Sequence, residues 1–352
     1  MALKSPRLTL VLIAALAACS PHSPEGPNGE HGGAFAHGIQ DLPPDPDLKP
    51  SLSSAKLNTW REKRAEQCLT IAEQPSNDIE RELAAIRDAI EGTDLGQRTF
   101  NELRGTKVSL CHEDSGFFDG EDTDKVAGLF KSKHRALGVV ERVSEGRQIL
   151  TGAHEYRHAW QNYAVEDAFG KGLGQVAHAT RNFIIEADAR TFAVAIAWQL
   201  KQQGDDRAWD AAMDLTKSYK PMAEAFEARM EQIAADEGQA AINSDSALTR
   251  SMSDAYNAWF TEPGNRQSYV NSLNRLFVKT MDSWASTATL PQGFAVQIGR
   301  VPGTGSSYLG HGALAQAEIE AVRSVQFPEG TIMPDRHAVA GPNLVNPGIG
   351  RP

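Results

Sequence analysis

Cysteine is scarce in this sequence: the 352 residues include only three, and no two of them form a Cys-x-x-Cys pair. A zinc site built from cysteines is therefore disfavoured. Lysine and arginine form no basic run, and the formal net charge is −10, which disfavours binding to nucleic acid. After residue 18, no apolar run approaches the length needed to span a bilayer.

The first 19 residues have the composition of an export signal. Lys4 and Arg7 supply positive charge, and an apolar run from Leu8 to Ala18 follows. This run is short for a membrane-spanning helix. Its end, Leu16-Ala17-Ala18-Cys19, resembles a bacterial lipobox, which implies cleavage before Cys19 and acylation of its thiol. The alternative is an ordinary cleaved signal in which Cys19 is incidental.

The lipobox also implies a location in the bacterial cell envelope. Ser20, rather than Asp, follows Cys19, and the resemblance then implies a lipoprotein anchored in the outer membrane and facing the periplasm. Cys68 and Cys111 would remain as the only thiols in an oxidising compartment. A disulfide between them would contribute roughly 3–4 kcal/mol, and two free buried thiols are the alternative.

Three kinds of segment follow the signal. Residues 20–52 are rich in Pro, Gly, Ser and Asp, which is typical of a flexible tether. Residues 53–286 predict one mostly helical domain, with a core at about 105–205 and a helical extension over 205–286. Residues 287–352 are again rich in Gly and Pro and predict a tail, with one helix from Ala313 to Val325.

The apolar periodicity predicts an α+β fold that is mostly helical. Helices are expected over Ala55–Gln74, Asn77–Ile90, Thr180–Gln203, 205–217, 221–236, 247–261 and 265–286. Short strands are expected over Lys107–Cys111, Val126–Phe130 and Leu137–Val140. The small sheet thus precedes residue 145, and most helices follow it.

The clearest chemical signal is an H-E-x-x-H pattern over residues 154–158. On a helix, residues four apart lie on the same face, so His154 and His158 can present their imidazoles to one metal ion. Glu155 lies beside them, in a position to act on a water molecule. The apolar residues around the pattern recur at helical spacing: Ile149, Ala153, Tyr156 and Trp160. A buried helix with two incidental histidines is the alternative.

A catalytic zinc site needs a third protein ligand and leaves one position open. Glu186 is the best candidate, because it is a carboxylate within an otherwise apolar stretch. Asp188, about 200° away around the same helix, is expected to orient a ligand histidine, or to be the ligand itself if the helix is rotated. An ordinary ion pair between Glu186 and Arg190 is the remaining interpretation.

The residues from His154 to Gln161, followed by Glu186-Ala187-Asp188-Ala189, resemble the metallopeptidase domains of bacterial proteins in the zincin group. A glutamate as third ligand is the gluzincin pattern. Many gluzincins have Asp four residues after that glutamate. This sequence has Arg190 there, so the orienting role is either missing or has moved to Asp188. The resemblance covers about residues 105–205.

The resemblance implies a zincin-like core, in which a small sheet precedes the motif helix and one edge strand pairs with the substrate. It also implies bound Zn²⁺ and a peptide or protein substrate. Glu155 would accept a proton from the attacking water and deliver it to the leaving amine. The oxyanion donor is left open among Tyr163, His178, Tyr219, Tyr256 and Tyr269.

The competing interpretation is a non-enzymatic envelope lipoprotein, a binding or scaffold module whose metal site is structural or vestigial. A structural site would be closed by a fourth protein ligand, whereas a catalytic site would open on a cleft. A structural site would also have no need of Glu155, and the presence of this base favours the enzyme.

Overall fold

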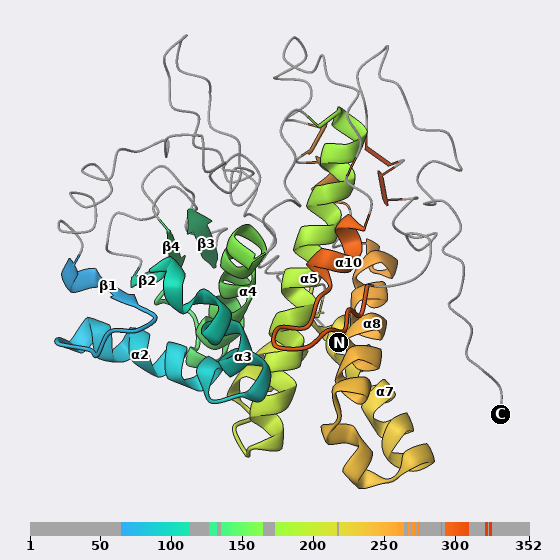
Figure 1. Cartoon of the computed structure of the whole chain (residues 1–352), viewed down its shortest axis with the longest axis horizontal. Helices are drawn as coiled ribbons and strands as arrows, with labels where there is room; N and C mark the ends of the chain where they lie inside the picture. The colour runs from blue at the N-terminus through green and yellow to red at the C-terminus, as the bar shows by residue number, and fades with distance from the viewer. Residues whose placement is uncertain are drawn as a thin grey trace, which may run out of the picture.

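The computed structural model describes a large part of the chain after residue 64. The described residues are 65–112, 127–131, 135–164, 173–216, 218–263, 267, 269–271, 273–274, 290, 293–309, 321–322 and 324–325. The central helix α5 (Gln175–Gln202) divides this part of the molecule (Figure 1). The sheet lies on one side of α5, and the later helices α7 (Lys220–Glu237) and α8 (Asp245–Thr261) lie on the other.

The sheet has four short strands: β1 (Cys68–Thr70), β2 (Ser109–His112), β3 (Gly128–Lys131) and β4 (Ala136–Val139). Their order is β1-β2-β4-β3, with β2 and β4 parallel and both outer pairs antiparallel. Every residue of β2 and of β4 is buried, so the two central strands form part of the core. The three strands expected from the sequence are present, each within two residues of its predicted bounds.

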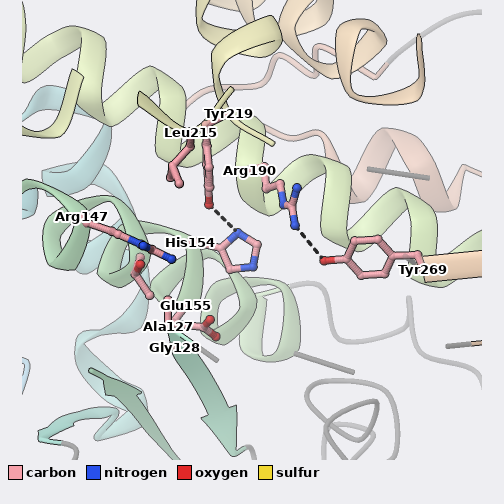
Figure 2. A pocket seen from close by; sticks show the side chains of 10 residues that line it. Ala127, Gly128, Arg147, His154, Glu155, Arg190, Leu215, Tyr219 and Tyr269 are labelled. Carbon is pink, nitrogen blue, oxygen red and sulfur yellow. Dashed lines mark hydrogen bonds between the residues drawn. The ribbon is translucent and has the colours of Figure 1, made fainter. Parts of the chain in front are cut away.

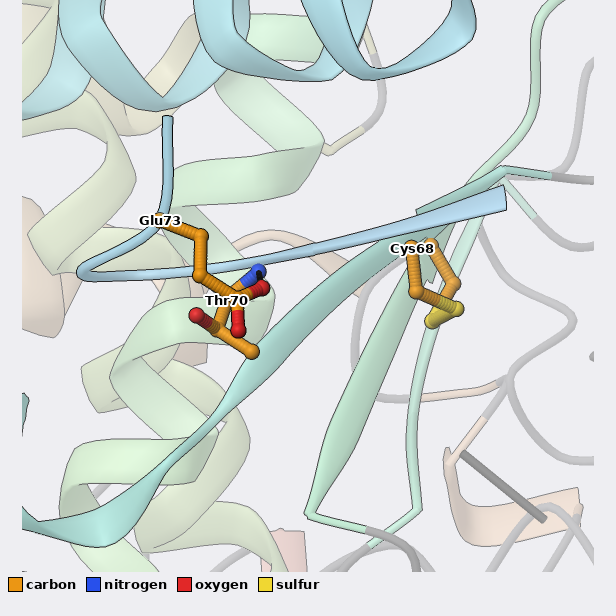
Figure 3. The surroundings of a disulfide bond; sticks show 4 residues. Cys68, Thr70 and Glu73 are labelled. Atoms are coloured by element: carbon orange, nitrogen blue, oxygen red, sulfur yellow. Dashed lines mark hydrogen bonds between the residues drawn. A yellow bond between two sulfur atoms is a disulfide. The ribbon is translucent and has the colours of Figure 1, made fainter. Parts of the chain in front are cut away.

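The first strand departs from the expectation. The helix predicted over Ala55–Gln74 is wrong where residues are described, because a short 3-10 turn, η2 (Ala65–Gln67), leads directly into β1. Cys68 in β1 lies opposite Cys111 in β2, and a disulfide joins them (Figure 3). Pairing with a strand about 40 residues away, together with this covalent link, outweighs the local helical periodicity.

Two helices, α2 (Asp78–Glu91) and α3 (Asp94–Leu103), connect β1 to β2. Asn77 and Thr93 cap them, because each side chain accepts a hydrogen bond from a backbone N–H in the first turn. A 3-10 turn, η3 (Arg104–Thr106), then leads into β2. Both helices pack against α4 (Glu145–Ala164), which carries the H-E-x-x-H residues and also contacts β3 and β4.

The helix α5 packs along α4 and is buried on nearly all sides. It begins five residues before the expected Thr180. A helix that is apolar around its whole circumference belongs in the interior of a domain, and α5 fits this rule. Its polar side chains are exceptions that require partners within the protein.

The helical extension consists of α6 (Arg207–Asp214), α7 (Lys220–Glu237), the 3-10 turn η7 (Gln239–Asn243) and α8 (Asp245–Thr261). These elements match the predicted helices over 205–217, 221–236 and 247–261. The helices α7 and α8 pack against each other, and α8 also packs against α5. The helix predicted over 265–286 lies mostly outside the described residues, but the described positions between 267 and 274 are helical.

The segment after residue 290 lies within the predicted tail. Its described part contains the short helix α10 (Phe294–Ile298) and a stretch of turns and bends to Leu309, in which Arg300 and Ser307 form an isolated antiparallel bridge. This stretch packs on the core, with Ile298 and Val301 almost completely buried. The helix predicted from Ala313 to Val325 lies largely outside the described residues.

The mostly helical α+β fold, with a small sheet before the motif helix and further helices after it, is therefore confirmed. None of the described helices is both long enough and apolar enough to cross a membrane. Cys19 and the segments predicted as signal (1–19) and tether (20–52) lie outside the described residues.

Candidate metal centre

Three side chains from α4 and α5 converge on one point. The Nε2 atoms of His154 and His158 lie 3.0 Å apart. The carboxylate oxygens of Glu186 lie 3.6 Å from Nε2 of His154 and 3.5 Å from Nε2 of His158. Zinc bonds of about 2.0–2.2 Å in tetrahedral geometry place ligand atoms roughly 3.3–3.5 Å apart. The spacing and the two-imidazole, one-carboxylate donor set therefore fit a zinc ion.

A glutamine holds His158 in the orientation that this site needs. Gln161 lies one turn along α4, and its Oε1 atom lies 2.8 Å from Nδ1 of His158. The Gln161 amide nitrogen donates to the carbonyl oxygen of Ile185 at 2.9 Å and to Asp188 at 2.5 Å. With the nitrogen so placed, Oε1 must accept the hydrogen bond, and Nδ1 of His158 must donate it. With the Nδ1 proton in this hydrogen bond, Nε2 is the ring nitrogen of His158 that faces Glu186 and His154.

Tyr219 plays a comparable part for His154. Its hydroxyl oxygen, from the first residue before α7, lies 3.3 Å from Nδ1 of His154 (Figure 2). A proton on Nδ1 leaves Nε2 of His154 free to act as a ligand. Burial, followed by the nearby His158 and Arg190, holds the pKa of His154 well below its ordinary value, which favours the neutral ring.

Glu186 is connected to the helical extension through Tyr269. The Tyr269 hydroxyl donates to the Glu186 carboxylate at 2.7 Å. Arg190, one turn further along α5, has its guanidinium 3.3 Å from the same hydroxyl (Figure 2). The pairing of Glu186 with Arg190 considered from the sequence thus takes the form of a bridge through Tyr269. Glu186 faces both histidines at the same time.

Asp188 faces away from the two histidines and is completely buried beside Arg157. Its two oxygens accept hydrogen bonds from Nε and Nη2 of Arg157 at 2.7 and 2.9 Å. Among the described residues, Gln161 is the one that links Asp188 to the candidate metal ligands, through its hydrogen bond with His158. Glu186, and not Asp188, therefore lies beside the two histidines, whereas Asp188 contacts the Gln161 side chain that is hydrogen-bonded to His158.

The last residue of α10 and the segment after it complete this buried network. Arg157 donates to the carbonyl oxygens of Ile298 and Arg300 at 2.6 and 3.1 Å. The hydroxyl of Tyr308 donates a short hydrogen bond to Asp188. Residues within the predicted tail therefore form hydrogen bonds with Arg157 and Asp188, the buried pair that is linked through Gln161 to the candidate metal centre.

Glu155, the residue after His154 on α4, lies at the wall of a pocket. Burial, and then the negative charge of Glu186, raise the pKa of Glu155 well above its ordinary value. The edge strand β3 approaches this carboxylate closely at Gly128. A Cβ atom there would lie 2.3 Å from Thr151 Cγ2 and 3.0 Å from Glu155 Oε1, so this approach requires glycine.

The pocket opens beside His154 and Glu155, and Figure 2 shows the side chains that surround it. The other lining residues are Ala127, Gly128, Arg147, Thr151, Arg190, Leu215, Tyr219 and Tyr269. Two of the five predicted oxyanion donors, Tyr219 and Tyr269, are therefore at the pocket. Tyr163, Tyr256 and His178 do not line it.

Sequence reasoning missed Gln161 and Arg157 as supporting residues. In the sequence analysis Gln161 appears only as the last residue of the segment that carries the family resemblance. Its signal was the three-residue spacing from His158, which places both side chains on one helix face. Arg157 stands inside the motif, and nothing local identifies its partner, because Asp188 is on another helix.

A family model described as "Putative metallopeptidase family (DUF6782)" matches residues 61–309. The matched range contains the predicted ligands, Glu155 and the supporting residues up to Tyr308. No curated protein and no solved structure matches the chain.

Proposed function

The chain belongs to this putative metallopeptidase family, and on that premise we propose that it is a zinc-dependent peptidase of the zincin type. His154, His158 and Glu186 would hold the zinc, and Glu155 would be the general base. The observation that carries the proposal is the convergence of three ligand atoms beside a pocket that Glu155 lines.

The coordination set favours a catalytic site over a structural one. Within the described part of the chain, no fourth His, Cys, Asp or Glu joins the group of three. A structural zinc site would be closed by such a ligand, whereas a catalytic site keeps one position for water or substrate. The pocket beside His154 and Glu155 leads to that position.

A zinc ion held by His154, His158 and Glu186 would supply a Lewis acid for a water molecule and for the scissile carbonyl. Glu155 would be the group that accepts the proton of the attacking water and delivers it to the leaving amine. Gln161 and Tyr219 keep the two imidazoles in the tautomer that the zinc needs.

Tyr219 is the better placed of the two pocket tyrosines to stabilise the oxyanion. If Nε2 of His154 binds the zinc, Nδ1 carries the proton and donates to the Tyr219 oxygen, which leaves the O–H proton of Tyr219 free to point into the pocket. The Tyr269 proton is already donated to Glu186. We therefore assign the oxyanion donor to Tyr219 and a ligand-orienting role to Tyr269.

The substrate we propose is a peptide or protein segment in the bacterial envelope. The edge strand β3 reaches the pocket at Ala127 and Gly128, so an extended peptide that pairs with this strand would pass in front of Glu155. Acylation of Cys19 would anchor the protein in the outer membrane, with residues 20–52 as a tether and residues 53–286 as the peptidase domain.

Metal analysis is the first test. We expect the purified protein to contain about one zinc per chain, and His158→Ala to lose most of it. The matched control is His178→Ala, which changes a buried histidine that does not line the pocket. Full zinc occupancy in the His158 variant would show that these residues do not form the site.

Hydrolysis of a synthetic peptide library, followed by mass spectrometry, is the second test. Glu155→Gln should keep its zinc and its fold but cleave nothing, because an amide cannot accept the water proton. Glu224→Gln, an exposed glutamate on α7, is the control and should cleave as the wild type does. Equal cleavage by the Glu155 variant would remove this residue from the mechanism.

A further inference from the structure

Two arginines line the pocket, and they differ in their partners. Arg190 is almost completely buried, is hydrogen-bonded to Tyr269, and lies in the field of the Glu186 carboxylate. Arg147 is only partly buried, and within the part of the chain described here it forms no ion pair. Its one charge interaction at the pocket is with Tyr219, which is a neutral side chain at ordinary pH.

Arg147 is placed on α4 so that its side chain is directed toward His154 and Glu155. It lies on the same helix face as Thr151, His154 and Glu155, at spacings of four, seven and eight residues. Seven residues correspond to about 10 Å along a helix axis, a distance that a long arginine side chain partly spans. Figure 2 shows its guanidinium reaching along the helix toward His154.

The environment of Arg147 disfavours an unpaired charge. Burial lowers its pKa, and among the residues that the structure describes no acid forms an ion pair with it. A guanidinium placed in this way gains most from a carboxylate, which can accept two parallel hydrogen bonds from it. A bound zinc would add further positive charge to the same pocket and would favour an anionic occupant.

We infer that Arg147 is a specificity residue that binds a carboxylate of the substrate close to the scissile bond. This inference rests on the proposed peptidase function. Successive residues of an extended peptide are about 3.3–3.8 Å apart, so the carboxylate belongs to a residue within one or two positions of the cleaved bond. Its source is either an Asp or Glu side chain or the free C-terminus of the peptide.

Binding of hydroxamate probes to the zinc-loaded, full-length protein tests this inference without requiring turnover. Each probe joins a zinc-binding hydroxamate to a single amino acid, Asp, Asn or Ala, with its α-carboxyl group either free or amidated. We expect the Asp amide to bind about 10- to 100-fold more tightly than the Asn amide if the side chain is recognised. If the C-terminus is recognised instead, the Ala probe with a free α-carboxyl group should bind more tightly than the Ala amide, by the same factor.

Variants then assign the preference to one side chain. In Arg147→Gln the preference for the charged probe should fall below about 3-fold, while zinc content and affinity for the uncharged Ala amide stay unchanged. Arg147→Glu should reverse the preference, so that a probe carrying Lys binds better than the Asp probe. Arg81→Gln, which changes an exposed arginine on α2, is the matched control and should behave as the wild type.

Two results would overturn this inference without affecting the proposed peptidase site. One is equal affinity of the wild type for charged and uncharged probes, and the other is an equal loss of affinity for all probes in Arg147→Gln. In both cases the Ala amide would still bind to the zinc, and the proposed peptidase site would stand. Failure of every hydroxamate to bind, together with absence of zinc, would instead refute the metal centre and the inference with it.

Discussion

Two carboxylates stand two residues apart on α5, and the structure predicts opposite consequences for their loss. Glu186 contacts both histidines, whereas Asp188 pairs with Arg157 behind the site. The change of each acid to its amide removes a charge and preserves the shape of the side chain. Glu186→Gln should therefore weaken zinc binding and spare the fold, and Asp188→Asn should mainly destabilise the fold.

The magnitude for Asp188→Asn follows from its burial. The side chains of Asp188 and Arg157 both have 0% exposure, and two hydrogen bonds join them. Removal of one partner of a buried ion pair leaves the other charge uncompensated, which costs about 3–5 kcal/mol. Because Asp188 contacts Gln161, zinc affinity should also fall, by up to about 100-fold, the usual upper range for residues that orient a ligand.

For Glu186, we expect a small loss of folding stability and a large loss of zinc affinity. Its side chain is 13% exposed, and its one hydrogen bond in the described structure comes from Tyr269. Loss of that bond in the metal-free protein should change the free energy of unfolding by only about 1 kcal/mol. Loss of a direct ligand should reduce zinc affinity by more than the roughly 100-fold expected of an orienting residue.

Urea unfolding of the metal-free variants and zinc titration against a competing chelator measure both quantities. The zinc titration should be made without urea, and the measured zinc affinity of each variant should be corrected for the fraction of its molecules that is folded. The reasoning would be refuted if Asp188→Asn lost more zinc affinity than Glu186→Gln among folded molecules. That outcome would mean that α5 is rotated relative to the arrangement described here.

Further predictions concern the covalent link, the pH dependence and the supporting hydrogen bonds. Replacement of Cys68 and Cys111 by Ala should lower the free energy of unfolding by about 4 kcal/mol, since the disulfide closes a loop with a sequence separation of 43; an unchanged urea midpoint would contradict this. Burial holds the pKa of His178 well below its ordinary 6.5, so the unfolded chain binds a proton that the folded chain does not. From pH 6.5 downward this histidine should therefore reduce stability by about 1.4 kcal/mol per pH unit until its folded pKa is reached, and His178→Gln should flatten the measured slope by that amount. Tyr308→Phe removes a donor to a buried carboxylate and should cost about 1.5–3 kcal/mol in thermal or urea unfolding, so wild-type stability would argue against the bond. Gln161→Leu should raise the zinc dissociation constant about 10–100-fold in a chelator competition, and an unchanged constant would remove its orienting role.

The sequence was most informative where the signal is local. The spacing of His154 and His158 places both rings on one helix face, whatever the rest of the chain does. Glu186 was identified by its chemistry, because a carboxylate in an apolar helix needs a partner. The structure places all three side chains together, and the mostly helical α+β architecture followed from periodicity over long segments.

The first strand shows where local patterns fail. A three-residue strand has too little periodicity to be distinguished from a helix, and the segment from Ala65 to Thr70 was predicted to be helical. Its strand conformation depends on pairing with β2 and on the disulfide to Cys111. Neither the partner strand nor the bond is encoded near the segment itself, so only the folded chain shows them.

By itself the sequence determined the metal-binding pattern on α4, the candidate base Glu155 and the carboxylate on α5, since helix geometry and the cost of buried charge act over a few residues. Tertiary structure decided which neighbours complete the site. Tyr219 reaches His154 across 65 residues, and the segment after α10 reaches Arg157 across more than 140. Such contacts depend on how helices pack, and packing is a property of the whole core rather than of any one segment.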